Sequence, residues 1–66
     1  MTKRLIIVRS EFMPLTVARV DGQVRAVITG PIKGRYGIDW RDGRPMERSH
    51  LDLESAVRAV REELGK

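Results

Sequence analysis

The chain has 66 residues, with 13 Lys and Arg against 9 Asp and Glu, a formal net charge of +4, and no cysteine. This length predicts a single small domain over residues 1–66, and the lack of cysteine excludes disulfide bridges and thiolate zinc sites, which leaves homodimerisation as a support for a small core. The longest apolar run is far shorter than the roughly 20 residues of a membrane span, so we expect a cytoplasmic protein with no membrane partner; its charge favours acidic partners.

Residues 5–9 predict the first strand, and because apolar side chains fall on both of its faces we expect an interior strand. Pro14 then interrupts the pattern, since proline cannot donate to a strand ladder. Phe12 and Met13 lie in this connection. We expect both to fold back onto the core.

The dipeptide Asp21-Gly22 predicts a two-residue hairpin turn between strands over 15–20 and 23–29. Pairing across the turn predicts a core face and a half-polar face. The expected core face holds Leu15, Val17, Val24, Ala26 and Ile28. The expected half-polar face holds Thr16, Ala18, Gln23, Arg25 and Val27.

Residues 30–34 contain two glycines and a proline and predict a loop. The glycine spacing matches neither the P-loop nor the dinucleotide-binding fingerprint, so we interpret this segment as a turn rather than a phosphate cradle. The strand over 35–41 follows, with Tyr36, Ile38 and Trp40 on one face and charged residues on the other.

A second Asp-Gly pair, Asp42-Gly43, predicts another tight hairpin with a short edge strand over 44–48. Such a turn would set Arg41 opposite Arg44 and Gly37 opposite Arg48. Like charges across a ladder repel, so this face would favour a bound anion unless neighbouring carboxylates neutralise it.

Asp52 predicts the start of a helix, because its carboxylate can accept a hydrogen bond from the first turn. Ser49 with Asp52 is a competing capping pair one turn earlier. An apolar stripe with helical spacing follows, and it predicts that the helix packs on the sheet. The expected fold is therefore α+β, an antiparallel sheet of four or five strands in hairpin order with one C-terminal helix packed on one face. The predicted core is Leu5, Ile7, Leu15, Val17, Val24, Ala26, Ile28, Tyr36, Ile38, Trp40, Leu53, Val57, Val60 and Leu64.

Catalysis requires a nucleophile with a base, a tuned pair of carboxylates, or a metal. The chain has one histidine, His50, next to Ser49, and neighbours in sequence seldom face each other productively. We therefore expect a non-catalytic protein with no cofactor and no metal.

Basic residues gather in one stretch of the sequence. Arginine matches phosphate oxygens and reads guanine, and a short sheet can enter the major groove. The alternative is an ordinary solvated strand face, whose charge Asp39, Asp42 and Glu47 would dilute. The residues predicted to bind nucleic acid or an acidic partner are Lys33, Arg35, Arg41, Arg44 and Arg48.

The stretch from Tyr36 to Leu64 joins an aromatic strand, a turn ending in glycine and a helix that begins with the sequence Leu51-Asp52-Leu53-Glu54-Ser55-Ala56. This pattern resembles the arm-type DNA-binding domains of phage integrases. It also resembles the partial double-stranded-RNA-binding-like fold of HicB antitoxins, although those carry an acidic segment before the helix where this chain is basic. We assign the chain to neither family. Both resemblances imply a phage or mobile-element setting in which very small proteins act by binding.

Two functions follow as hypotheses. The first is a non-catalytic accessory protein that binds DNA or RNA through its arginines. The alternative is a small protein-binding inhibitor or regulator that blocks a host complex through a basic sheet face or an edge strand. A homodimeric structural module is a third, plainer possibility.

Overall fold

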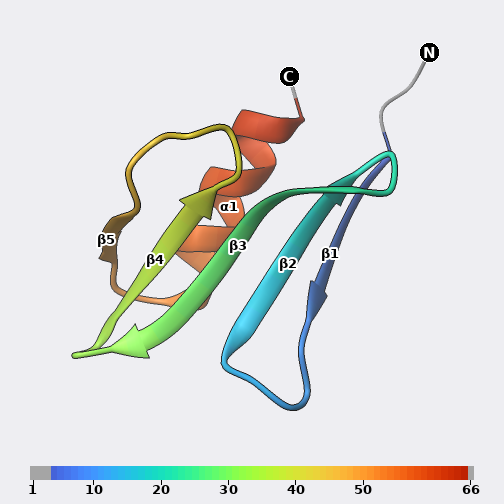
Figure 1. The fold of residues 1–66 in the computed structure, drawn as a ribbon. Helices are drawn as coiled ribbons and strands as arrows, with labels where there is room; N and C mark the ends of the chain where they lie inside the picture. The colour runs from blue at the N-terminus through green and yellow to red at the C-terminus, as the bar shows by residue number, and fades with distance from the viewer. Residues whose placement is uncertain (1–3, 66) are drawn as a thin grey trace.

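The computed structural model describes residues 4–65, which form a five-stranded antiparallel sheet with a single helix against one face (Figure 1). Each strand pairs with its neighbour in sequence, so the order across the sheet is β1-β2-β3-β4-β5. The predicted α+β fold is confirmed. Its elements are β1 (Leu5–Arg9), β2 (Leu15–Val20), β3 (Gln23–Ile32), β4 (Arg35–Trp40), β5 (Glu47–His50) and α1 (Leu53–Leu64).

The hairpin between β2 and β3 forms at the predicted turn. Asp21 and Gly22 both have positive φ, 51° and 85°, as a primed two-residue turn requires, and Val20 pairs with Gln23. Beyond the turn, however, a β-bulge at Arg25 shifts the register. An extra residue on one strand changes which face the side chains beyond it occupy.

The bulge overturns part of the predicted core. Ala18, and not Val17, pairs with Ala26. Thr16 and Ala18 are therefore buried beneath α1, although both were expected on the half-polar face. Conversely, three residues predicted for the core lie on the face away from α1: Leu15, Val17 and Val24.

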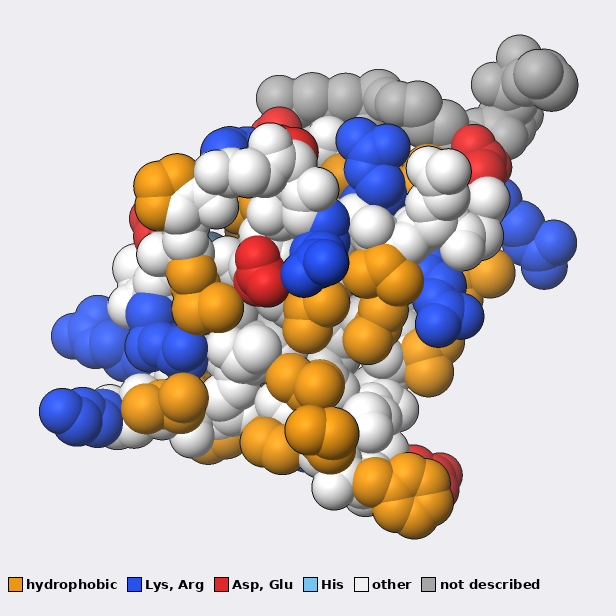
Figure 2. All heavy atoms as spheres, in the orientation of Figure 1, with side chains coloured by type: hydrophobic (Ala, Val, Ile, Leu, Met, Phe, Trp, Pro, Cys, Tyr) orange, Lys and Arg blue, Asp and Glu red, His pale blue; other side chains and the backbone are white. Residues whose placement is uncertain are grey.

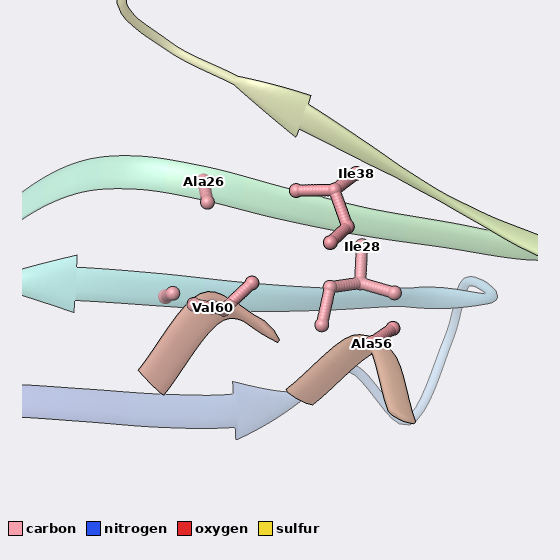
Figure 3. Close-up of a cluster of buried hydrophobic side chains, with 6 residues drawn as sticks. Ala26, Ile28, Ile38, Ala56 and Val60 are labelled. Carbon is pink, nitrogen blue, oxygen red and sulfur yellow. The ribbon is translucent and has the colours of Figure 1, made fainter. Parts of the chain in front are cut away.

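The core lies between α1 and the middle of the sheet, and small side chains form much of it (Figure 3). Alanines on the strands and on α1 allow the helix to approach the sheet closely, while few large side chains are completely buried. The buried apolar residues are Ala18, Ala26, Ile28, Ile38, Ala56 and Val60. Around them pack Leu5, Ile7, Tyr36, Trp40, Leu53, Val57, Ala59 and Leu64.

The prediction of an interior first strand is wrong, because β1 forms an edge of the sheet. Ile6 and Val8 point away from α1 and are 43% and 58% exposed. The expectation for the following connection is also wrong. Phe12 is 93% exposed and Met13 59% exposed, so neither packs on the core.

The segment over 30–34 is mostly strand, since β3 runs to Ile32 and only Lys33 and Gly34 form the turn. Gly30 is required here: its φ is +123°, and a Cβ atom would lie 2.9 Å from the carbonyl oxygen of Arg35. The predicted loop therefore reduces to a two-residue turn, which extends the β3–β4 hairpin into a projecting tip (Figure 1).

The predicted tight hairpin at Asp42-Gly43 does not form. The type I′ turn that Asp-Gly favours needs positive φ at both central residues, and of this pair only Gly43 has it. Instead, the carboxylate of Asp42 accepts the backbone N–H of Arg44 at 3.1 Å, which makes a side-chain turn. Residues 41–46 consequently form a loop, and β5 begins only at Glu47.

The helix begins where predicted. Asp52 has an extended backbone, and its carboxylate accepts the N–H of Ser55 at 2.7 Å. Within residues 4–65 no helix is long and apolar enough to cross a membrane.

Candidate nucleic-acid interface

The sheet has one face covered by α1 and one face that no element among residues 4–65 covers, which we call the open face (Figure 1). On β4, Tyr36, Ile38 and Trp40 point towards α1. Because strand side chains alternate, Arg35 and Asp39 project from the open face. The backbone N–H of Arg41 donates to the carbonyl of Arg25 at 3.0 Å, so the extended backbone continues past the end of β4 and Arg41 projects from the open face as well.

Arg48 on β5 lies across the open face, against Gly37 of β4. A Cβ atom at Gly37 would lie 3.2 Å from its Cζ atom, so the glycine makes room for the guanidinium. Nη2 of Arg48 donates to Oγ1 of Thr29 at 3.4 Å and contacts the sulfur of Met46 at 3.2 Å. The Arg48 side chain therefore contacts Gly37, but the predicted regular pairing of these residues is replaced by an irregularity between the Tyr36–His50 and Ile38–Glu47 pairs.

The guanidinium of Arg48 carries one further feature. Its Nη1 atom is buried and has no hydrogen-bond partner among the described residues. A cationic donor that has lost water without gaining a partner is energetically unfavourable.

Arg41 remains accessible on the open face. Its Nη1 atom lies 3.6 Å from Oδ2 of Asp39, and both side chains are substantially exposed, at 57% and 39%. An exposed pair at this distance contributes little and is readily exchanged for another anion. Asp39 therefore weakens the positive charge here without removing it.

Arg44 lies elsewhere, which corrects the prediction that it faces Arg41. Its guanidinium stacks over the ring of Trp40 with 4.5 Å to the centroid, on the side of the sheet that α1 covers. Its Nε atom lies 2.7 Å from Asp42, and Nη1 lies 3.4 Å from Glu63 of α1. Because Trp40 points towards the helix, the loop carries Arg44 to the same side, where it joins the loop to α1.

Lys33 and Arg35 lie at the tip of the β3–β4 hairpin, and both are exposed. Arg48 contacts Gly37, which is two residues from Arg35, so Lys33, Arg35 and Arg48 lie at one end of β4. Arg41 follows the other end of β4. Arg35 and Arg41 are six residues apart, which in an extended strand spans about 20 Å. We call Lys33, Arg35, Arg41 and Arg48 the basic arc.

The sequence did not single out Arg19, which also projects from the open face, beside Ile6 and Val17. The bulge at Arg25 determines that Arg19 pairs with Val24 of β3, and no residue pattern marks that bulge. These residues border a hollow of about 300 Å³ on the β1–β2 half of the open face. Figure 2 shows the open face with hydrophobic side chains over its middle and lower part, basic side chains at either side, and a basic and an acidic side chain next to each other above the hydrophobic patch.

The helix side has a hollow of about 290 Å³ beside Arg25 and Arg44. Three carboxylates line it as well, those of Asp21, Asp42 and Glu63, so it does not favour an anion. The pKa of Asp42 lies below its ordinary value, first because the backbone N–H of Arg44 donates to the carboxylate, and further because the guanidinium of Arg44 does.

Within residues 4–65 no three histidine or acidic side chains are grouped in a way that would hold a metal ion. Comparison with protein-family models gives no match, and neither curated proteins nor solved structures give one.

Proposed function

We propose that this domain binds nucleic acid without catalysing a reaction, through the basic arc on its open face. The observation that carries the proposal is the placement of Arg35, Arg41 and Arg48 on one uncovered sheet face, where Asp39 forms a weak, exposed ion pair with Arg41. Guanidinium groups bind phosphate oxygens in paired hydrogen bonds, which suits the exposed arginines Arg35 and Arg41.

The dimensions of the basic arc suit a duplex. Its ends lie about 20 Å apart along β4, whereas the DNA major groove is about 12 Å wide. A sheet entering the groove could therefore place its ends on the phosphates at both sides. Between those ends the open face offers Thr29 and apolar side chains such as Val27, which suit base edges and thymine methyl groups. A cytoplasmic setting and a phage or mobile-element origin belong to the same proposal.

Fluorescence anisotropy with labelled random-sequence duplex DNA and RNA at low salt tests this function. Arg41→Glu should weaken binding at least tenfold, because it reverses an exposed charge of the basic arc. Arg58→Glu changes the net charge equally but lies on the exposed side of α1, away from the open face, and should have a much smaller effect. Equal effects of the two variants, or no binding by the unchanged protein, would reject the proposal.

A second candidate function, binding and inhibiting a host protein, is favoured by a different observation. Phe12 and Met13 are held outward in a structured turn, where the hydroxyl of Ser10 accepts both of their backbone N–H groups at 3.3 Å. Phe12 and Met13 thus expose two neighbouring apolar side chains, and an aromatic side chain is a common anchor where a partner protein buries it.

A photoreactive amino acid in place of Phe12 tests this alternative in cells. Covalent capture of one acidic protein in stoichiometric amount, abolished by competition with the unmodified domain, would support it. The same photoreactive group placed at Arg58 is the control. Equal labelling from both positions would count against a specific site at Phe12.

A further inference from the structure

Among residues 4–65, nothing covers the edge of the sheet formed by β1, whereas the opposite edge is short and irregular. β5 has only four residues, all of them polar or charged, and its pairing with β4 is irregular. β1 pairs regularly with β2 over all five of its residues and contains neither proline nor a bulge. Natural sheets usually blunt their edges with charge, proline, bulges or short strands. β1 uses none of these apart from Arg9 at its end.

The hydrogen bonds of β1 show which backbone groups point to the free edge. The N–H of Arg4 donates to the carboxylate of Asp21, and its C=O accepts the backbone N–H of Asp21, each at 3.0 Å. The N–H of Ser10 donates to the C=O of Leu15 at 2.8 Å. Both residues thus direct backbone groups towards the β2 side. Because these directions alternate along an antiparallel strand, Leu5, Ile7 and Arg9 direct theirs outward.

We propose that two copies of this chain associate by pairing their β1 strands antiparallel about a two-fold axis at Ile7, joining the two sheets into one. In this register Ile7 pairs with Ile7 of the second copy, and Leu5 pairs with Arg9 at both ends. All the outward backbone groups of Leu5, Ile7 and Arg9 are then satisfied, with about six inter-chain hydrogen bonds, two for each pair.

Neighbouring registers satisfy fewer groups. An axis at Ile6 or at Val8 leaves two hydrogen-bonded pairs within Leu5–Arg9, or about four bonds. An axis between two residues would place outward-directed backbone groups of one copy opposite inward-directed ones of the other, so they could not bond. The axis between Ile6 and Ile7 would also set Arg4 opposite Arg9, and like charges directly across a ladder repel. The axis at Ile7 avoids both problems.

The side chains favour the same register. On the open face, Ile6 of one copy lies opposite Val8 of the other, and these partly exposed residues form an apolar cross-strand pair at each side of the axis. The completely buried core of one chain has only three large side chains among the described residues, those of Ile28, Ile38 and Val60, and no disulfide supports it. Domains of this size without disulfides or metals often gain stability from association.

Self-association does not depend on nucleic-acid binding, because β1 carries no residue of the basic arc. Pairing would present the basic arc twice on one continuous face, which raises the affinity for a long duplex without adding contacts within either copy. Loss of pairing would therefore leave binding of a short duplex intact, and the two proposals fail separately.

Sedimentation equilibrium of the unchanged protein, with variants at Arg9, tests whether this edge pairs. We expect a reversible species of twice the chain mass. Arg9→Pro should weaken it at least tenfold, because proline removes an outward N–H while leaving the bonds to β2 in place. Arg9→Ala keeps that N–H and should change the association at most threefold. Circular dichroism checks that both variants fold. A protein that stays monomeric up to about 1 mM, where even a weak association would be detected, would overturn the proposal. Equal effects of the two variants would overturn it as well.

Cysteine cross-linking tests the register, since the chain has no cysteine of its own. Residues directly opposite in a non-hydrogen-bonded pair have Cα atoms about 4.5 Å apart, within the range of a disulfide. Ile6→Cys and Val8→Cys proteins of different mass are mixed equally in a glutathione buffer. An axis at Ile7 predicts the mixed disulfide, between one copy of each variant, well above the half expected at random. Disulfides formed mainly between two copies of the same variant, or random proportions, would overturn this register.

Discussion

Replacing Arg44 with alanine separates a structural arginine from the binding arginines. The substitution removes the stacking on Trp40, which at an exposed site contributes about 0.5–1 kcal/mol. It also removes the contacts with Asp42 and Glu63, and partly exposed ion pairs of this kind contribute about 0–1 kcal/mol each. We expect Arg44→Ala to lower the free energy of unfolding by about 1–2 kcal/mol. In a domain of this size each kcal/mol lowers Tm by about 4–8 °C.

Urea denaturation followed by circular dichroism measures this loss, because Trp40 fluorescence would itself respond to the missing guanidinium. Arg41→Ala is the matched control: it removes the same charge from an exposed side chain with one weak ion pair, and should change stability by less than about 0.5 kcal/mol. For duplex binding we expect the opposite ranking of the two variants: Arg41→Ala should weaken the affinity more than Arg44→Ala does. Unchanged stability in Arg44→Ala, together with an affinity loss equal to that of Arg41→Ala, would refute the assignment of Arg44 to the fold.

Three further predictions concern stability. Asp52→Ala should lower the free energy of unfolding by about 1 kcal/mol in urea titrations, whereas Asp52→Asn, which still accepts the N–H of Ser55, should cost clearly less; equal losses would contradict the capping role. Ala56→Leu should destabilise by about 1–3 kcal/mol, because the helix meets the sheet closely there, and a neutral result would mean that the core has spare room. Folding lowers the pKa of Asp42, so its carboxylate stabilises the fold above its unfolded pKa, and that contribution is lost as pH falls through the folded pKa. Urea titrations on the acid side of about pH 4 should show a decline that is smaller in Asp42→Asn, and identical pH profiles would contradict this.

The fold was predictable from the sequence because its strongest signals are local. The backbone angles of Asp21-Gly22 set the turn, and the Asp52 carboxylate bonds three residues ahead, and the structure has the turn and the helix start at those positions. The same dipeptide at Asp42-Gly43 gave a wrong prediction. There the carboxylate bonds to Arg44, whose guanidinium is drawn to Trp40, so the chain leaves the hairpin path.

The faces of the sheet were less predictable than its strands. A one-residue bulge at Arg25 decides whether Val17 or Ala18 lies beneath α1, and nothing in the residue pattern marks the bulge. Sequence also cannot tell an edge strand from an interior one when both faces are apolar, as in β1. Among the basic residues, the contact between Arg48 and Gly37 was predictable because the two lie on neighbouring strands. The position of Arg44 on the helix side of the sheet was not predictable, because it depends on a tertiary contact with Glu63 of α1.

The salt dependence of duplex binding tests the central claim most directly. Each phosphate neutralised contributes about −0.9 to the slope of log Kobs against log salt, so the four residues of the basic arc predict a slope of about −3 to −4. Arg35→Ala should make the slope less steep by about 0.9, and Arg58→Ala should leave it unchanged. The same slope in all three proteins, or no measurable binding at the lowest salt concentration, would contradict a nucleic-acid interface on the open face.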